Sequence, residues 1–257
     1  GANMNPCLDC KVFMVSKAVE WVKENRKDGF DFIITGEVIG QRPMSQRKQT
    51  MPIISKESGA DDILLRPLCA KNLPATKPEL EGWVDREKLY DFSGRNRKPQ
   101  MALAEQFGFK DYASPAGGCC FLTDKNYSAK LVDLWEGRGT RDYEMDDIMR
   151  LKVGRHVRPK PEFKLIISRD AGESKYLEGY RKQYVTIQVV SHNGPLTIVD
   201  GDITVDDYEL AAGVVARYGQ GRDAEEVEVE ITAPGQEKKT MMIKPLLKAQ
   251  VSVEWHI

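Results

Sequence analysis

The stretch FDFIITG, residues 30–36, is a short apolar run that ends in glycine. Such a run is typical of a buried strand in a parallel sheet, which delivers a loop at its carboxyl end. DDILLRPL, residues 61–68, predicts a second strand of this kind. A helix is expected over residues 11–27, where valines recur at helical spacing, and REKLYDF and KPQMALAEQFGF predict two short helices. This alternation indicates an α/β layer structure, in which ligands bind at the carboxyl ends of the strands.

The sequence pattern changes after about residue 145. KLIISRD, YVTIQVVS, LTIVDGDI and EVEVEIT predict strands, and DDYELAAGVVARY, residues 206–218, predicts a helix. The tail that begins TMMIKPLL can add a further strand. We therefore expect an α/β domain over residues 1–140 and a smaller α+β domain over residues 148–257. The polar, glycine-containing stretch EGRGTRDYEMDD, residues 136–147, is the expected hinge between them.

The composition of the 257-residue chain is that of a globular protein, with 41% apolar residues and a net charge of −1. No apolar run approaches the roughly 18 residues that a membrane span needs, so we expect no membrane span. The first residues are polar, so no signal peptide is expected. The five cysteines are odd in number and clustered, which favours thiol or metal chemistry over a disulfide framework. This usage of cysteine indicates a reducing compartment and predicts a cytoplasmic protein.

Four of the five cysteines occur in two short stretches. NPCLDC places Cys7 and Cys10 before a predicted helix, whose dipole lowers the pKa of a thiol at its N-terminus. SPAGGCC places Cys119 and Cys120 after two glycines, which suits a tight, exposed loop. Four thiolates can hold zinc, whereas three thiolates and one open iron suit an iron–sulfur cluster. Inert structural thiols are the third alternative.

Charge is unevenly distributed along the chain. Residues 150–182 are strongly basic, and residues 200–237 are strongly acidic. The basic stretch predicts a contact surface for a polyanion, with a solvated basic face as the alternative. Its cationic residues are Arg150, Lys152, Arg155, Arg158, Lys160, Lys164, Arg169, Lys175, Arg181 and Lys182.

Residues 3–135 resemble a known enzyme family. GRNRKPQMALAEQFGFKDYASPAGGCCFLTD, residues 94–124, is similar to the region of bacterial tRNA 2-thiouridylases that leads to their persulfide-forming cysteine. FDFIITGE and NPCLDC resemble two further stretches of these enzymes, which belong to the PP-loop, or adenine nucleotide α-hydrolase-like, superfamily. The C-x-x-C with a third cysteine is similar to the cluster-dependent tRNA thiolases. The resemblance implies the C-terminal half of a Rossmann-like PP-loop parallel sheet.

The resemblance also implies an activity, in which ATP activates a uridine carbonyl of tRNA and sulfur replaces the oxygen. Cys7, Cys10 and one of Cys119 and Cys120 would hold a 4Fe–4S cluster or relay a persulfide, with zinc as the alternative metal. A sulfur donor is then an expected partner. The pyrophosphate loop of the superfamily, Ser-Gly-Gly-x-Asp-Ser, does not occur in this sequence. ATP and Mg²⁺ are therefore expected only if this loop lies upstream of the sequence, and the open edge of a half sheet suggests a partner surface or a homodimer.

The predicted nucleotide-binding positions follow the two apolar runs. Thr35 and Gly36 match the strand-end turn of the family, although Glu37 stands where the family has histidine. Further candidates crowd the loops after the two strand ends, where arginine suits a phosphate group. A solvated basic loop is the alternative for these residues, which are Gln41, Arg42 and Arg66.

KLIISRDAGESKYL and ELAAGVVARYGQGRDAEEVEVEIT resemble the RNA-binding domain of NFACT proteins of ribosome quality control. The resemblance implies RNA contacts, for which we select basic residues from both domains: Arg95, Lys98, Arg155, Arg158 and Lys160. The sequence thus predicts a tRNA sulfurtransferase. A non-catalytic RNA-binding protein with structural zinc and a sulfur or redox carrier that acts on proteins are the two alternatives.

Overall fold

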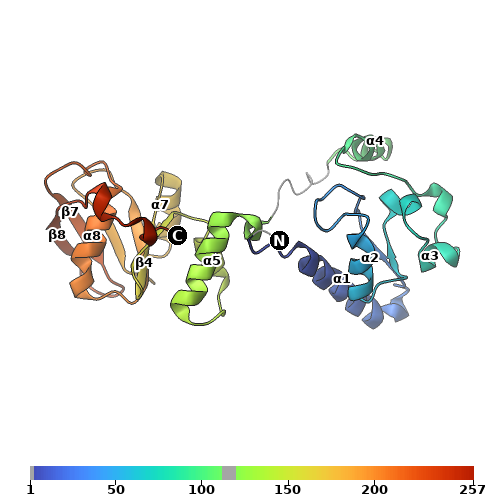
Figure 1. Cartoon of the computed structure of the whole chain (residues 1–257), viewed down its shortest axis with the longest axis horizontal. Helices are drawn as coiled ribbons and strands as arrows, with labels where there is room; N and C mark the ends of the chain where they lie inside the picture. The colour runs from blue at the N-terminus through green and yellow to red at the C-terminus, as the bar shows by residue number, and fades with distance from the viewer. Residues whose placement is uncertain (1–2, 112–119) are drawn as a thin grey trace. The chain divides into compact units, whose positions relative to one another are not determined.

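The computed structural model describes residues 3–111 and 120–257 (Figure 1). The chain forms two compact units. The N-terminal unit comprises residues 5–118, and the C-terminal unit comprises residues 119–257 together with residues 1–4. No helix in the two described ranges is long and apolar enough to cross a membrane.

The described part of the N-terminal unit is built from α1 (Cys7–Glu24), β1 (Ile33–Ile34), α2 (Thr50–Glu57), β2 (Leu64–Leu65), α3 (Lys77–Leu80) and α4 (Lys98–Gln106). β1 and β2 pair in parallel, as the two apolar runs predict, with Ile33 opposite Leu64. The ladder takes up just two residues of each run. A pair of this size does not define a Rossmann-like sheet, so a PP-loop fold is not shown.

The core of the N-terminal unit lies along α1. Val15, Val19 and Val22 are buried against α2 and β2. They are spaced three or four residues apart and therefore share one face of the helix. The helix predicted over residues 11–27 is confirmed as far as Glu24, and it begins earlier than expected, at Cys7.

The C-terminal unit contains α5 (Lys125–Arg138), α6 (Met145–Arg150), β3 (Arg155–Lys160), β4 (Phe163–Ile167), α7 (Ala171–Glu178), β5 (Thr186–Val189), β6 (Leu196–Gly201), α8 (Tyr208–Arg217), β7 (Val227–Thr232) and β8 (Lys239–Ile243). The strands form a six-stranded antiparallel sheet in the order β3-β4-β6-β5-β7-β8. The sheet and α8 are visible together in Figure 1.

One face of this sheet is covered by α8. Ala211, Val214 and Val215 of α8 are buried among the inward side chains of the strands. In β7 the sequence VEVEIT alternates, so that its valines and isoleucine are buried and its glutamates are more exposed. This period of two predicts β7, whereas β4 and the first four residues of β6 are buried throughout and follow from their short apolar runs. The unit is mixed α/β around an antiparallel sheet, in agreement with the α+β expectation.

The opposite face of the sheet is apolar at one end and polar at the other. Ile166 of β4, Ile198 of β6, Thr186 of β5 and Thr232 of β7 form one row across the strands. Leu177 of α7 packs against the two isoleucines. The two threonines instead line an open cavity.

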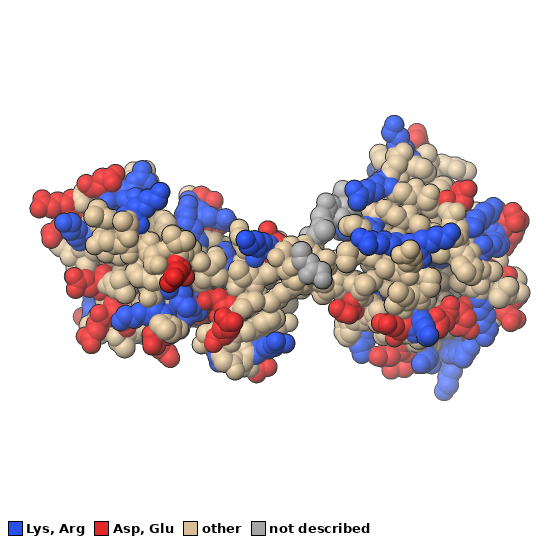
Figure 2. Space-filling model, in the orientation of Figure 1, with Lys and Arg blue, Asp and Glu red and all other residues tan. Residues whose placement is uncertain are grey.

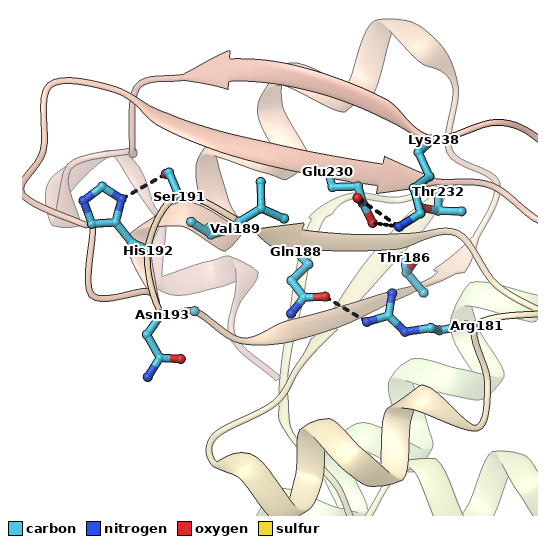
Figure 3. A pocket seen from close by; sticks show the side chains of 12 residues that line it. Arg181, Thr186, Gln188, Val189, Ser191, His192, Asn193, Glu230, Thr232 and Lys238 are labelled. Carbon is cyan, nitrogen blue, oxygen red and sulfur yellow. Dashed lines mark hydrogen bonds and ion pairs between the residues drawn. The ribbon is translucent and has the colours of Figure 1, made fainter.

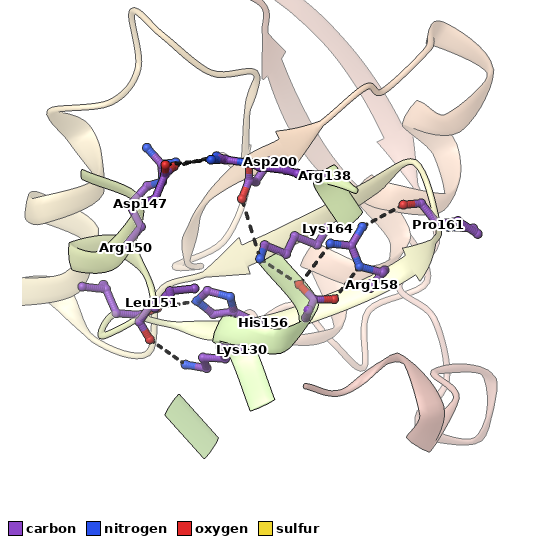
Figure 4. A network of polar contacts seen from close by, with 12 residues as sticks. Lys130, Arg138, Asp147, Arg150, Leu151, His156, Arg158, Pro161, Lys164 and Asp200 are labelled. Atoms are coloured by element: carbon purple, nitrogen blue, oxygen red, sulfur yellow. Dashed lines mark hydrogen bonds and ion pairs between the residues drawn. The ribbon is translucent and has the colours of Figure 1, made fainter. Parts of the chain in front are cut away.

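Charged side chains connect α5 to the sheet (Figure 4). Asp133 of α5 accepts hydrogen bonds from Arg158 Nε at 2.6 Å and from Lys164 Nζ at 2.8 Å. These contacts help to place α5 and α6 in the C-terminal unit, which begins upstream of the hinge expected at residues 136–147.

Candidate functional site

A cavity of about 610 Å³ opens beside the N-terminal end of α5 in the C-terminal unit. It is formed by the start of α5, the turn that precedes it, the turn between α6 and β3, and the loop between β4 and α7. We call it the Cys120 cavity, because the exposed Cys120 is among its lining residues. The lining residues that matter chemically are Cys120, Phe121, Lys130, Lys152 and Arg169.

The local sequence fixes the start of α5 at the cavity. The carboxylate of Asp124 accepts a hydrogen bond from the backbone N–H of Tyr127 at 2.8 Å, which caps the helix. The ring of Tyr127 packs in an apolar cluster with Leu151, and its hydroxyl donates to the carbonyl of Ile148 at 3.2 Å. These contacts hold the first turn of α5 against α6 and so position Lys130 one turn further along.

Lys130 is a half-buried cation at the cavity. Its Nζ donates to the carbonyl of Gly154 at 3.0 Å. Gly154 has a φ of 73°, and a Cβ there would lie 2.8 Å from the carbonyl oxygen of Ile167, so the turn requires glycine. Burial lowers the pKa of Lys130 to about 8, and the positive charges of Arg169 and Lys164 add to this effect.

Two further cations reach the cavity from other elements. The Nζ of Lys152 lies 4.5 Å from the centroid of the Phe121 ring. Arg169 Nε donates to Glu173 Oε1 at 2.8 Å. The lining residues thus include three cations and one carboxylate, that of Asp124, and Glu173 next to the cavity pairs with Arg169. An excess of positive charge in a half-enclosed site favours the binding of an anion such as phosphate.

The two cysteines of the C-x-x-C stretch lie in the first turn of α1, whereas the sequence predicted them just before the helix. The backbone N–H of Cys7 donates to Asn5 Oδ1 at 3.1 Å, and Cys10 is exposed. Cys120 belongs to the other unit, and Cys119 lies outside the described residues. In the part of the chain that the structure describes, no group of three or more His, Cys, Asp or Glu side chains could hold a metal ion. The 4Fe–4S cluster and the zinc alternative both stay predictions.

Arg66, which we expected at a nucleotide, takes part in a buried ion pair of the N-terminal unit. Its Nε donates to Glu37 Oε2 at 3.1 Å, and its Nη1 donates to Ser55 Oγ at 3.2 Å. Thr35 Oγ1 donates to the same carboxylate at 2.9 Å, and Lys11 Nζ lies 3.3 Å from its other oxygen. In this structure Arg66 and Thr35 hold a buried carboxylate at the strand end. A nucleotide-binding role for either residue stays a prediction.

The remaining candidates of the N-terminal unit have polar surroundings. Gln41 exchanges hydrogen bonds with Gln100 of α4 at 3.0 and 3.3 Å. A Cβ added at Gly36 would meet no atom within 4 Å, so the turn leaves open space there. The roles of these two residues stay predictions, as do those of the half-buried Arg42 and the exposed Arg95 and Lys98.

The three residues of the C-terminal unit that we predicted to contact RNA differ in exposure and in ion pairing. Arg155 is exposed. Arg158 is paired with Asp133, and Lys160 forms an ion pair with Asp207. Two of the three therefore already have an acidic partner from another element.

The basic stretch over residues 150–182 is consequently not one continuous contact surface. Arg150 and Lys164, from the same stretch, are buried and paired with carboxylates. Figure 2 shows basic and acidic side chains interspersed on the visible face of the C-terminal unit. Sequence reasoning did not single out Lys130, because this cation of the Cys120 cavity lies on a helix outside the basic stretch.

Comparison with known proteins bears on the C-terminal unit. Residues 154–256 match a family model described as the NFACT protein RNA binding domain. No curated protein matches the chain. A solved structure of the C-terminal part of the fibronectin/fibrinogen-binding protein from Streptococcus suis is similar at a TM-score of 0.35 and 10% identity, over 97% of this chain and 90% of that one. This likeness is too weak to bear on the fold. What is shown is that the chain contains, over residues 154–256, a domain similar to the RNA-binding domain of NFACT proteins.

Proposed function

We propose that the C-terminal unit binds RNA. The observation that carries this proposal is the match of residues 154–256 to an RNA-binding domain. The Cys120 cavity supports it, since cations from three segments meet there beside the ring of Phe121, which is 55% exposed. Cations neutralise RNA phosphates, and an exposed aromatic ring offers a stacking surface to an unpaired base.

The RNA that we propose is tRNA, as the sequence resemblances suggest. Lys130, Lys152 and Arg169 would contact phosphate groups, which gives affinity without reading the base sequence. A folded RNA presents its phosphates in a fixed arrangement, so shape would supply most of the selectivity.

Binding of labelled tRNA, followed by fluorescence anisotropy, tests the proposal. Lys152→Glu with Arg169→Gln removes two cations from the cavity and should weaken binding at least about tenfold. The matched control is Lys175→Glu with Lys182→Gln, which changes the net charge equally at two exposed lysines that do not line the cavity. Thermal unfolding of each variant verifies that it is folded. RNA binding by the unit is refuted if the wild-type protein does not bind tRNA, and the cavity is excluded if variant and control bind alike.

A second candidate function is tRNA thiolation, which we propose because Cys120 lies in the cavity that would hold an RNA phosphate. In this reaction ATP adenylates a uridine oxygen, a sulfide equivalent from a sulfur donor forms the new carbon–sulfur bond, and the oxygen leaves with AMP. Cys7, Cys10 and one of Cys119 and Cys120 would carry the sulfur, either as a persulfide or through a 4Fe–4S cluster. ATP and Mg²⁺ would need the pyrophosphate loop that this sequence lacks.

Anaerobic purification followed by iron, sulfide and zinc analysis separates the versions of this second function. About four irons with matching sulfide, lost in Cys7→Ala and in Cys10→Ala, would support the cluster. Stoichiometric zinc without visible absorbance would favour a structural metal in a non-catalytic RNA-binding protein. If the protein contains no metal, the persulfide relay is the remaining version. Bound tRNA should then protect Cys120 from alkylation.

A further inference from the structure

A second cavity, of about 860 Å³, lies on the sheet face that α8 does not cover. It extends over β5 and β7 to the loop after β5, and it shares no lining residue with the Cys120 cavity. Figure 3 shows Arg181 and Gln188 turned toward each other near one end, while His192 lies at the other end. We call it the sheet-face cavity.

The register of the sheet explains why this face is open. Leu196 of β6, Gln188 of β5 and Glu230 of β7 form one row, next to the row that contains Thr186 and Thr232. The apolar side chain of Leu196 is buried in the cluster beneath α7. From β5 onward the same rows carry polar side chains, which need no apolar cover. Thr186 is buried, whereas Gln188, Glu230 and Thr232 are half-buried and line the cavity.

Two cationic side chains, those of Arg181 and Lys238, contact the polar residues of these rows. Arg181 Nη2 donates to Gln188 Oε1 at 2.8 Å, which leaves other donors of the guanidinium directed at the cavity or solvent. Lys238 Nζ lies 3.0 Å from Glu230 Oε1, and this lysine is 65% exposed in its side chain. Both are therefore surface cations whose present partners are weak competitors for a phosphate group.

The loop after β5 adds groups suited to a nucleobase. Ser191 Oγ and His192 Nδ1 are hydrogen-bonded at 2.9 Å, and Asn193 lies beside them in the cavity wall. Amides such as those of Gln188 and Asn193 can both donate to and accept from a base edge. An imidazole ring can stack on a base.

We propose that the sheet-face cavity binds an unpaired nucleotide of RNA, with Arg181 and Lys238 at its phosphate and Gln188 and Asn193 at its base. The inference rests on the proposed RNA binding and adds a second contact site to it. All lining residues lie within residues 154–256, the range that matches an RNA-binding domain. The cavity volume falls in the range of small-ligand sites.

The lining chemistry favours a nucleotide over a protein partner. Amide, hydroxyl and charged groups predominate among the lining residues, whereas the centre of a protein interface is depleted of charge. An unpaired nucleotide is favoured over a duplex, because base edges are accessible to side chains mainly in single-stranded RNA.

The test compares a single-stranded oligoribonucleotide with a perfectly paired RNA hairpin. The variant is Arg181→Ala with Lys238→Ala, and the matched control is Lys175→Ala with Lys182→Ala, two exposed lysines outside the cavity. We expect the variant to lose at least about tenfold in affinity for the single strand and to bind the hairpin as the wild-type protein does. The control should bind both RNAs unchanged.

Ultraviolet crosslinking to the single strand gives a second readout that does not depend on the folding of a variant. A crosslinked peptide that contains residues 188–194 supports the proposal. If the wild-type protein binds the single strand but crosslinks elsewhere, or if the variant binds it normally, the sheet-face cavity is excluded while RNA binding stands. If the wild-type protein binds the hairpin but not the single strand, the sheet-face cavity is also excluded. If it binds neither of these RNAs and does not bind tRNA, the proposed function itself fails.

Discussion

His156 of β3 is a buried histidine in a region of the C-terminal unit where positive charge gathers. Its Nε2 lies 3.0 Å from the carbonyl of Val153, so we assign the proton to Nε2. Its Nδ1 has no hydrogen-bond partner among the described residues. Burial lowers the pKa of His156 well below 6.5, and the charges of Lys130 and Lys164 lower it further. The imidazole is therefore neutral in the folded unit.

This histidine should make the stability of the C-terminal unit depend on pH. Below the unfolded-state pKa of about 6.5, the unfolded chain binds a proton at His156 that the folded unit does not bind. The contribution is therefore fully present above this pH and is lost as the pH falls, at up to about 1.4 kcal/mol per pH unit. Urea unfolding at pH 7.5, 6 and 5 measures it. His156→Gln should flatten the profile above pH 5, and an unchanged slope in this variant would contradict the assignment.

Lys130 should make RNA affinity depend on pH in the alkaline range. Its pKa is about 8, so the ammonium loses its proton near this pH and a phosphate contact is lost as the pH rises. A charge-assisted hydrogen bond is worth about 1.5–3 kcal/mol, and with a pKa of about 8 its loss lowers the affinity by up to about tenfold between pH 7 and pH 9. Lys130→Arg keeps its charge over this range and should bind tRNA with little dependence on pH. Equal pH profiles for the two proteins would show that Lys130 does not touch the RNA.

At the scale of elements, the attachment of α5 to the sheet depends on Asp133. Burial alone would raise the pKa of this carboxyl, but the hydrogen bond from Arg158 and the charge of Lys164 outweigh it and leave the pKa below 3.8. Lys164 is 1% exposed in its side chain, and its nearest carboxylate is Asp133 at 2.8 Å, followed by Asp200 at 3.7 Å. The network therefore pairs the buried ammonium of Lys164, whose burial without a carboxylate would cost free energy of folding.

Asp133→Asn should destabilise the C-terminal unit by about 1–3 kcal/mol, since it leaves the buried Lys164 with the more distant Asp200 as its carboxylate partner. Chemical denaturation at pH 7 measures the change in the free energy of unfolding. Asp142→Asn, in the exposed loop between α5 and α6, is the matched control and should cost less than about 0.5 kcal/mol. Equal stabilities of the two variants would mean that α5 is held by its apolar contacts.

The elements that the sequence predicts well are those with a regular pattern. The strand β7 follows from alternation, β4 and β6 follow from short apolar runs, and the helix α8 follows from helical spacing. The parallel pairing of β1 and β2 is also predicted, but its length of two residues is not, because a buried run does not reveal how much of it joins a ladder. The position of α5 could not be predicted, since Asp133 has partners 25 and 31 residues further along the chain.

At the scale of the whole molecule, the candidate functional residues are distributed over both units. The N-terminal unit carries Cys7 and Cys10 in the first turn of α1, one turn earlier than the start of the helix that the sequence predicts. The C-terminal unit carries the Cys120 cavity and the sheet-face cavity. Composition and motifs indicate RNA as a partner. They do not distinguish a free cation such as Arg155 from a paired one such as Arg158, because pairing depends on tertiary structure.

The salt dependence of tRNA affinity tests the central claim, RNA binding through the Cys120 cavity, most directly. Affinity is measured for the wild-type protein and for Lys152→Glu with Arg169→Gln over a series from about 50 to 200 mM salt. We predict that the logarithm of affinity falls linearly with the logarithm of salt concentration, and that the variant has a shallower slope by about one for each phosphate contact removed. Absence of tRNA binding at the lowest salt, or identical slopes for the two proteins, would contradict the account.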